Sequence, residues 1–179
     1  MTNMTSVKEL NKIIRNHLIE QSELNQKNVL NAISNYGETL DKLIENQVFG
    51  SYQKTDVVLL FQLNSRDNDA DISFTDSDDK IVYYKSYEIY ITMYGDNSPN
   101  VGNKISARFR TQNVKNSLLD SGIYLEYISN PTIINEFKNK SLWIRTDLSI
   151  GIRCQFSISQ IGEEDNFNVI NTVNIINKN

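Results

Sequence analysis

Asp67, Asp69 and Asp71 have the i, i+2, i+4 spacing of the first ligands in a calcium-binding loop. Such a loop also needs glycine at its sixth position, where the chain turns sharply, and a bidentate glutamate at its twelfth. Ile72 stands at the sixth position and Asp78 at the twelfth. The pattern therefore favours a solvated acidic loop over a calcium site, and we predict no metal site here.

The other reactive side chains are isolated from one another. The 179-residue chain contains one histidine, His17, and one cysteine, Cys154, which excludes an intrachain disulfide and a zinc-binding cysteine cluster. We interpret His17 as a structural histidine, exposed or half-buried. Cys154 lies on the apolar side of a predicted strand, where we expect a buried and inert thiol.

No other motif in the chain points to catalysis. Gly95 and Gly102 do not have the spacing of a phosphate-binding loop. No two carboxylates are placed convincingly for acid–base work. We therefore predict no catalytic residue, no cofactor and no enzymatic activity.

The charge pattern gives no sign of a nucleic-acid groove, because the formal net charge is −4 and no block of basic residues occurs. Lys104, Arg108 and Arg110 form a short basic patch on a predicted helix, which is either a solvated face or a contact for an acidic partner. The longest apolar run, residues 57–61, is far too short to cross a bilayer. Residues 1–20 lack the apolar segment of a signal peptide. We expect a soluble protein without membrane partners, made in the cytoplasm.

Hydrophobic periodicity predicts helices in the N-terminal part of the chain. Residues 6–19 carry an apolar stripe, and Ser6 with Glu9 forms a capping-box pair at its start. A second helical pattern covers residues 28–48, as one helix or as two shorter ones separated near Gly37. Residues 57–61 are apolar on both alternating faces, which is typical of a strand buried on both sides, and a long polar loop follows to residue 79.

Residues 80–94 alternate strictly and predict a strand with one apolar face and one face of tyrosine, glutamate and threonine. Gly95 leaves the strand, and we expect Ser98 to cap a helix with Pro99 at its first position. This helix runs to about Phe109. A shorter helix over residues 114–121 ends at Gly122, and residues 123–129 predict another strand.

Residues 142–158 give the clearest strand signal, because apolar residues occupy even positions and mostly polar ones the odd positions. Gly151 indicates a bulge or a bend. We predict one domain over residues 1–162 and a C-terminal arm over 163–179, with a strand that a neighbouring subunit completes. The fold class is α+β, with a mixed or antiparallel sheet of about four to five strands flanked by N-terminal and central helices.

Several pieces in series, within residues 83–158, resemble the phage tail-terminator or neck-terminator family. Residues 86–95, S-Y-E-I-Y-I-T-M-Y-G, are similar to a family strand that ends in Tyr-Gly, and the helix after them is similar to the one that follows it. L-L-D-S-G-I at 118–123 is similar to leucines followed by Gly-Ile at the start of a strand. Asn130-Pro131 is similar to a proline-bearing turn, and W-I-R-T-D-L at 143–148 to the final strand.

This resemblance implies a virion ring, usually of six copies, that is added when the tail tube has reached its length. The ring stops polymerisation, docks to the connector or adaptor of the head, and lets DNA pass through its lumen without specific binding. No catalysis or cofactor is implied. Alternatives are a head-completion adaptor or a tail-tube subunit, which share the small α+β build, and a non-viral binding module or enzyme.

Two sets of residues follow from this reading as hypotheses. An interface between proteins would include tyrosines of the 80–94 strand, basic residues of the next helix and apolar residues of the arm: Tyr84, Tyr90, Tyr94, Lys104, Arg108, Phe167 and Val169. An acidic loop facing the lumen would repel the DNA backbone: Asp67, Asp69, Asp71, Asp76, Asp78 and Asp79.

Overall fold

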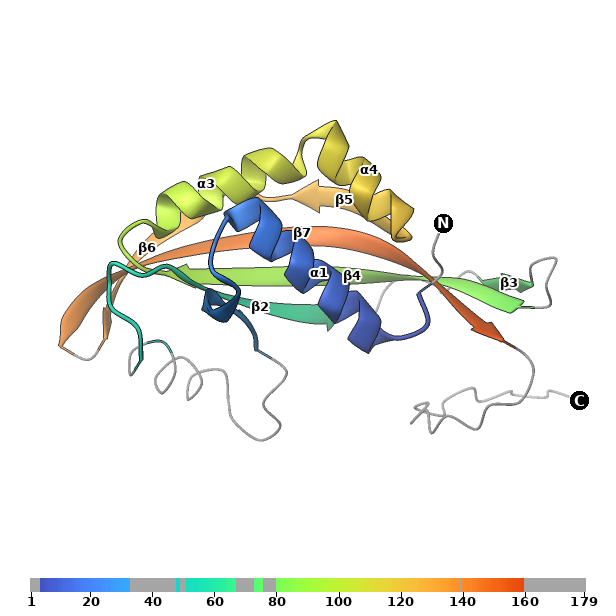
Figure 1. Ribbon diagram of the computed structural model, residues 1–179, viewed down its shortest axis with the longest axis horizontal. Coiled ribbons are helices and arrows are strands. Elements are labelled where there is room, and N and C mark those ends of the chain that lie inside the picture. The colour runs from blue at the N-terminus through green and yellow to red at the C-terminus, as the bar shows by residue number, and fades with distance from the viewer. Residues whose placement is uncertain are drawn as a thin grey trace, which may run out of the picture.

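The structure, a computed structural model, describes residues 4–32, 48, 51–66, 73–75, 80–138 and 140–159. Within these residues, α-helices lie over one face of a long, twisted sheet (Figure 1). The helices are α1 (Val7–Ser22), α3 (Ser98–Phe109) and α4 (Gln112–Asp120), with a 3₁₀ turn η1 (Gln26–Asn28). The strands are β1 (Val29–Asn31), β2 (Val58–Ser65), β3 (Ser73–Thr75), β4 (Lys80–Tyr94), β5 (Ile123–Ile128), β6 (Thr132–Lys138) and β7 (Ser141–Ser159).

The sheet is mixed and has the order β1-β2-β4-β7-β5, with β3 paired to β4 and β6 paired to β7. β1 and β2 are parallel, and the remaining pairs are antiparallel. The predicted α+β class with N-terminal and central helices is therefore confirmed. The described residues form seven strands, more than the four to five expected.

The additional strands are β1, β3 and β6. β1 pairs with the distant β2, whereas β3 and β6 pair with the strands that follow them in sequence. β1 lies where the helix over residues 28–48 was predicted to begin, so that part of the prediction is wrong. Val29 pairs with Leu59 and is fully buried, and this sheet contact outweighs the local helical pattern. Residues 33–47 of that prediction lie outside the described residues. β3 lies within the predicted loop over residues 64–79, and β2 continues to Ser65.

The start of α1 follows the predicted capping pattern. The hydroxyl of Ser6 accepts a hydrogen bond from the backbone N–H of Glu9 at 3.2 Å. The carboxylate of Glu9 accepts in return from the backbone N–H of Thr5 at 3.0 Å. These bonds satisfy N–H groups that have no partner inside the helix.

The centre of the sheet is the antiparallel pair β4–β7, which runs in continuous register from Lys80↔Ser159 to Tyr94↔Arg145. Odd residues of β4 and even residues of β7 point toward the helices, as the alternation predicts. Their apolar side chains form the main core with β2 and the helices: Leu59, Phe61, Ile89, Ile91, Leu148, Ile150, Ile152, Leu10, Ile14, Ile105 and Phe109.

The irregularity expected at Gly151 lies in the partner strand instead. The register of β5 against β7 shifts between Leu125 and Tyr127. A Cβ on Gly151 would lie 2.2 Å from Cε1 of Tyr127. Glycine at this position therefore lets the Tyr127 ring lie directly on β7.

The turn after β4 depends on Gly95, whose φ is +130°. Its N–H donates to the carbonyl of Ile144 at 3.1 Å. α3 begins at Ser98, but Asn97 precedes it as the cap residue without a side-chain hydrogen bond. The prediction that Ser98 caps the helix is therefore wrong. Its buried hydroxyl instead lies 3.0 Å from that of Thr146, which fixes α3 to β7.

Candidate interaction surface

The sheet face opposite α1, α3 and α4, called the open face here, carries aromatic and charged side chains. It is formed by even residues of β4 and odd residues of β7, and it continues onto β5. One end of this face is covered by a small second core that contains Val58, Leu60, Tyr94 and Trp143. The rest of it carries Tyr84, Glu88, Tyr90, Thr92, Arg145, Asp147, Ser149, Arg153, Gln155, Tyr124 and Tyr127.

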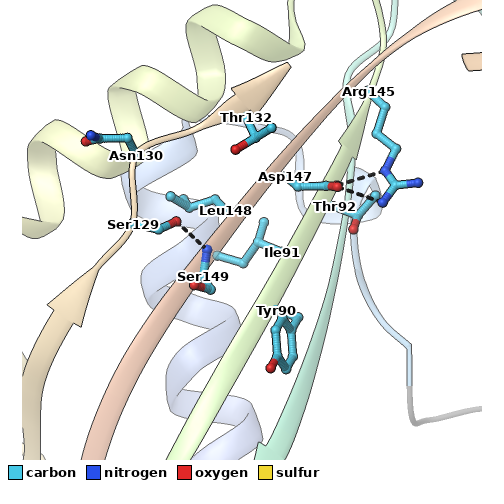
Figure 2. A pocket seen from close by; sticks show the side chains of 10 residues that line it. All are labelled: Tyr90, Ile91, Thr92, Ser129, Asn130, Thr132, Arg145, Asp147, Leu148 and Ser149. Carbon is cyan, nitrogen blue, oxygen red and sulfur yellow. Dashed lines mark hydrogen bonds and ion pairs between the residues drawn. The ribbon is translucent and has the colours of Figure 1, made fainter. Parts of the chain in front are cut away.

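A polar cavity of about 380 Å³ lies next to this second core (Figure 2). Its main ionic feature is a fork in which Arg145 donates two hydrogen bonds to Asp147, at 2.9 and 2.6 Å. The Asp147 contact raises the pKa of the Arg145 guanidinium. The remaining lining is hydroxyl-rich, and the backbone N–H of Ser149 donates to Ser129 Oγ at 2.9 Å. Such a lining suits polar side chains of another protein.

An aromatic pocket of about 440 Å³ lies near the other end of the open face, lined by Tyr84, Tyr124, Glu126 and Arg153. The two tyrosine rings are tilted, with centroids 6.2 Å apart. The guanidinium carbon of Arg153 lies 5.6 Å from the centroid of the Tyr84 ring, within cation–π range. Burial raises the pKa of Tyr84, so its hydroxyl remains a neutral hydrogen-bonding group.

Between the two cavities, Tyr127 donates a hydrogen bond to Glu88, whose side chain is buried. Arg66 forms an ion pair with Glu126 and lies 5.9 Å from the centroid of the Tyr127 ring. Burial, followed by the hydrogen bond to Glu88, raises the pKa of Tyr127 to about 12. The charged groups in this region are therefore held by partners within the chain and stand in fixed positions.

The predicted interface tyrosines of β4 differ in exposure. Tyr90 is 51 % exposed on the open face, and Tyr84 is half-buried in the aromatic pocket. Tyr94 is only 2 % exposed, and its hydroxyl donates to Glu136 at 3.1 Å. Burial raises the pKa of Tyr94. The Tyr94 ring therefore contributes to the second core and not to an accessible surface.

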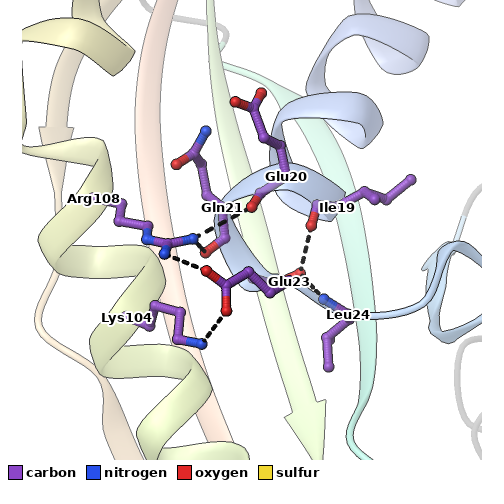
Figure 3. A network of polar contacts seen from close by, with 8 residues as sticks. Ile19, Glu20, Gln21, Glu23, Leu24, Lys104 and Arg108 are labelled. Carbon is purple, nitrogen blue, oxygen red and sulfur yellow. Dashed lines mark hydrogen bonds and ion pairs between the residues drawn. The ribbon is translucent and has the colours of Figure 1, made fainter.

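The predicted basic patch on α3 has an acidic partner within the same chain (Figure 3). Lys104 Nζ lies 2.8 Å from a carboxylate oxygen of Glu23, and Arg108 pairs with the other oxygen. Glu23 ends α1 in a left-handed conformation, with φ of 59°. Hydrogen bonds from Lys104 and then Arg108 lower the pKa of Glu23. Arg110 donates to Asn130 Oδ1 at 3.0 Å, so this patch connects elements of one subunit.

The remaining predicted site residues lie outside the described residues. These are Phe167 and Val169 of the arm and the aspartates of the acidic loop, at positions 67, 69, 71, 76, 78 and 79. Within the described ranges, no three histidine, cysteine, aspartate or glutamate side chains gather as metal ligands would. None of the helices in the described part of the chain is long and apolar enough to cross a membrane.

Cys154 is fully buried, and burial raises the pKa of its thiol, which agrees with the prediction of an inert side chain. His17 is 8 % exposed on α1, more deeply placed than expected. Burial lowers the pKa of His17 below its ordinary value of 6.5, opposed by the nearby Glu20. The neutral imidazole is therefore the form that the folded chain accommodates best.

We expect the free energy of unfolding to decrease as the pH falls below about 6.5, because the unfolded chain then binds a proton that buried His17 resists. Urea unfolding between pH 5.5 and 7.5 measures this slope. In His17→Gln the part of the slope due to this residue should disappear, whatever the change in absolute stability. An equal slope in both proteins would contradict the assignment.

Sequence reasoning did not identify several residues of the open face. Tyr124 and Tyr127 lie in a predicted strand, but the bulge that brings Tyr127 over Gly151 has no local sequence signal. The fork of Arg145 and Asp147 was visible as polar residues on alternate positions of residues 142–158. Only the pairing of β6 and β4 with β7 brings Glu136 and Tyr94 beside this fork.

The fold and the open face define a class of small α+β proteins in which helices cover one side of a long mixed sheet. The chain belongs to the phage neck terminator family, since the family model described as phage neck terminator protein matches residues 8–179. It is therefore a structural component of the bacteriophage neck, as the resemblance in residues 83–158 indicated. No curated protein matches the chain significantly.

Proposed function

We propose that this protein forms the ring, of six copies, that caps the tail tube and joins it to the head connector. The observation that carries the proposal is the family match over residues 8–179. A ring uses two different patches on each subunit, one for each neighbour. The open face, with the exposed Tyr90 and two cavities, offers one extended surface for such contacts. The role is structural and needs no catalytic group.

The ring must bind the tail tube on one side and the connector or adaptor on the other. The polar cavity beside Arg145 and Asp147 suits one of these contacts, because its charged groups are already paired before any partner arrives. Pre-positioned polar groups lose little conformational freedom when a partner docks. Assembly of this kind takes place in the cytoplasm of the bacterial host, where the chain is made.

Particles produced without this protein test the proposed function directly. Electron microscopy should show tails of uncontrolled length that are not attached to heads. Heads that leak DNA while tails keep their normal length would instead identify a head-completion adaptor. Absence of tail tubes would identify a tube subunit, and normal particles would contradict a structural role in the neck.

The acidic loop over residues 67–79 is proposed to face the lumen, where its six aspartates repel the DNA backbone and keep passage free. Replacing these aspartates with asparagine should slow DNA ejection, with an effect that weakens as salt increases. Ejection kinetics of purified particles measure this. A control is replacement of the exposed Asp96 and Asp120, which lie elsewhere. Equal ejection rates in all particles would contradict a lumenal position for the loop.

The C-terminal arm, residues 163–179, is proposed to add a strand to a neighbouring subunit through Phe167 and Val169 and the apolar residues after them. Its alternation of apolar and polar residues supports this. Truncation after residue 162 should then leave the fold of the subunit intact and weaken self-association, as measured by sedimentation.

A further inference from the structure

One face of the β6–β7 hairpin carries three large apolar side chains that are exposed. Ile133 is 57 % exposed, Phe137 is 72 % exposed and Leu142 is 54 % exposed. Phe137 lies directly opposite Leu142, and Ile133 opposite Thr146, so these side chains share one face of the hairpin. We call Ile133, Phe137 and Leu142 the hairpin stripe.

The hairpin stripe lies where the hairpin extends past its neighbours. β4 ends at Tyr94, opposite Arg145, while β7 and β6 continue to the turn at Lys140. Figure 1 shows the hairpin projecting from one end of the sheet, beyond the N-terminal end of α3. The helices cover the even-numbered residues along most of β7, but Leu142 lies beyond them and is exposed. Exposed apolar side chains gathered in this way mark contact sites.

The aromatic pocket lies toward the opposite end of the same sheet. Along the β4–β7 pair, Tyr84 is opposite Gln155, whereas the hairpin begins beyond the pair of Tyr94 and Arg145. These positions are ten residues apart on β4, which is roughly 34 Å at about 3.4 Å per residue. The hairpin stripe and the aromatic pocket therefore cannot meet within one rigid subunit.

We propose that the hairpin stripe of one copy of this chain seats in the aromatic pocket of a second copy. Phe137 would pack on the rings of Tyr84 and Tyr124, which are the predominant apolar lining. The pocket, of about 440 Å³, is ample for such a ring, since cavities of about 150 Å³ already accommodate benzene. Lys140, exposed at the hairpin turn, then approaches Glu126 at the pocket rim and joins its ion pair with Arg66.

This contact is heterologous, because the hairpin stripe and the aromatic pocket lie at opposite ends of the sheet. Each copy therefore donates a hairpin to one neighbour and receives one from the other. Repetition of such a contact gives a closed ring when the rotation between copies closes, and a filament when it does not. The inference rests on the proposed ring function and names the surfaces that join its subunits.

Cysteine cross-linking tests the pairing, in a Cys154→Ala background that removes the native thiol. The variants are Lys140→Cys alone, Glu126→Cys alone and both together, which leave Phe137 and the two tyrosine rings in place. Under mild oxidation, the double variant should give a ladder of covalent multimers, while each single variant should remain monomeric on denaturing gels. Efficient dimers from Lys140→Cys alone would show that hairpins meet each other and would overturn the proposal.

Self-association gives a second, independent readout. Phe137→Lys should weaken it at least about tenfold in sedimentation experiments, because the new charge would lose its hydration in the aromatic pocket and would be repelled by Arg153. The exposed side chain makes little contribution to the fold of the monomer, so circular dichroism should be unchanged. Phe137→Leu should retain most of the association, and Lys115→Asp on α4 is the matched surface control.

The outcomes separate this inference from the proposed function. A ring that forms equally well from the wild-type chain and from Phe137→Lys, without a cross-linked ladder, would overturn the hairpin contact and leave the ring intact. A wild-type chain that remains monomeric at high concentration and on purified tube ends would overturn the ring itself, and the hairpin contact with it.

Discussion

Substituting alanine for Gly95 is expected to lower the free energy of unfolding by roughly 3–5 kcal/mol, from backbone strain and overpacking together. The φ of +130° is rarely adopted by residues with a side chain. A Cβ would also lie 2.3 Å from the carbonyl oxygen of Asp56, which belongs to the backbone and cannot rotate away. Relief would require a shift of the turn that joins β4 to α3.

Chemical denaturation measures this change, with Asp96→Ala as the control. Asp96 follows Gly95 and its side chain is exposed, so we expect its replacement to change stability by no more than about 0.5 kcal/mol. If Gly95→Ala were as stable as the control, the turn would have to adopt a different backbone conformation. Loss of the turn should also disturb the contact of Ser98 with Thr146, since both depend on where α3 begins.

Replacing Leu148 with alanine should lower the free energy of unfolding by about 2–5 kcal/mol, the range for a buried leucine that leaves a cavity. Leu148 is 3 % exposed and lies in the main core between the sheet and the helices. Leu142→Ala is the matched substitution in the same strand, and both side chains lie on the same face of β7. Leu142 is 54 % exposed, and its replacement should cost no more than about 0.5 kcal/mol in the monomer.

The comparison must be made at low concentration, where subunits are separate. At concentrations that allow assembly, Leu142→Ala should weaken self-association more than Leu148→Ala does, because Leu142 belongs to the hairpin stripe. Equal losses of monomer stability would show that Leu142 is covered within its own subunit. That result would also remove one of the three side chains on which the hairpin contact depends.

The two faces of the sheet thus have different roles in the subunit. Apolar residues hold the helices on one face, and the β4–β7 pair gives this core a rigid base over the whole length of the sheet. The open face does not hold these helices. It carries tyrosines, arginines and carboxylates whose contacts are formed within the chain. A subunit built in this way can present a preformed surface to several protein partners.

The amino-acid sequence determined the elements whose signals are local. Alternation predicted β4 over residues 80–94 in agreement with the structure, and β7 to within one residue at each end. The capping pair at Ser6 and Glu9 predicted the start of α1, and Gly122, with φ of 74°, follows the end of α4 as expected. These signals are reliable because they depend on neighbours within a few residues.

Tertiary structure alone decided which elements pair over long distances. β1 and β3 have only three residues each, and the partners of β1 on β2 are 30 residues away in the chain. The helical pattern at residues 28–31 was outweighed by burial of Val29 against β2. β6 had no clear apolar alternation, because none of its residues is buried and neither of its faces has to be apolar. A local pattern cannot report such contacts.

The same division applies to the candidate surfaces. The sequence alone placed Tyr84, Tyr90 and Tyr94 on one face of a strand, and the structure agrees. It could not show that Tyr94 is covered by Trp143 and Val58 while Tyr90 is exposed, nor that Glu23 forms ion pairs with both Lys104 and Arg108. Periodicity states which way a side chain points from its own backbone, whereas exposure and charge pairing depend on what the rest of the chain brings to that side.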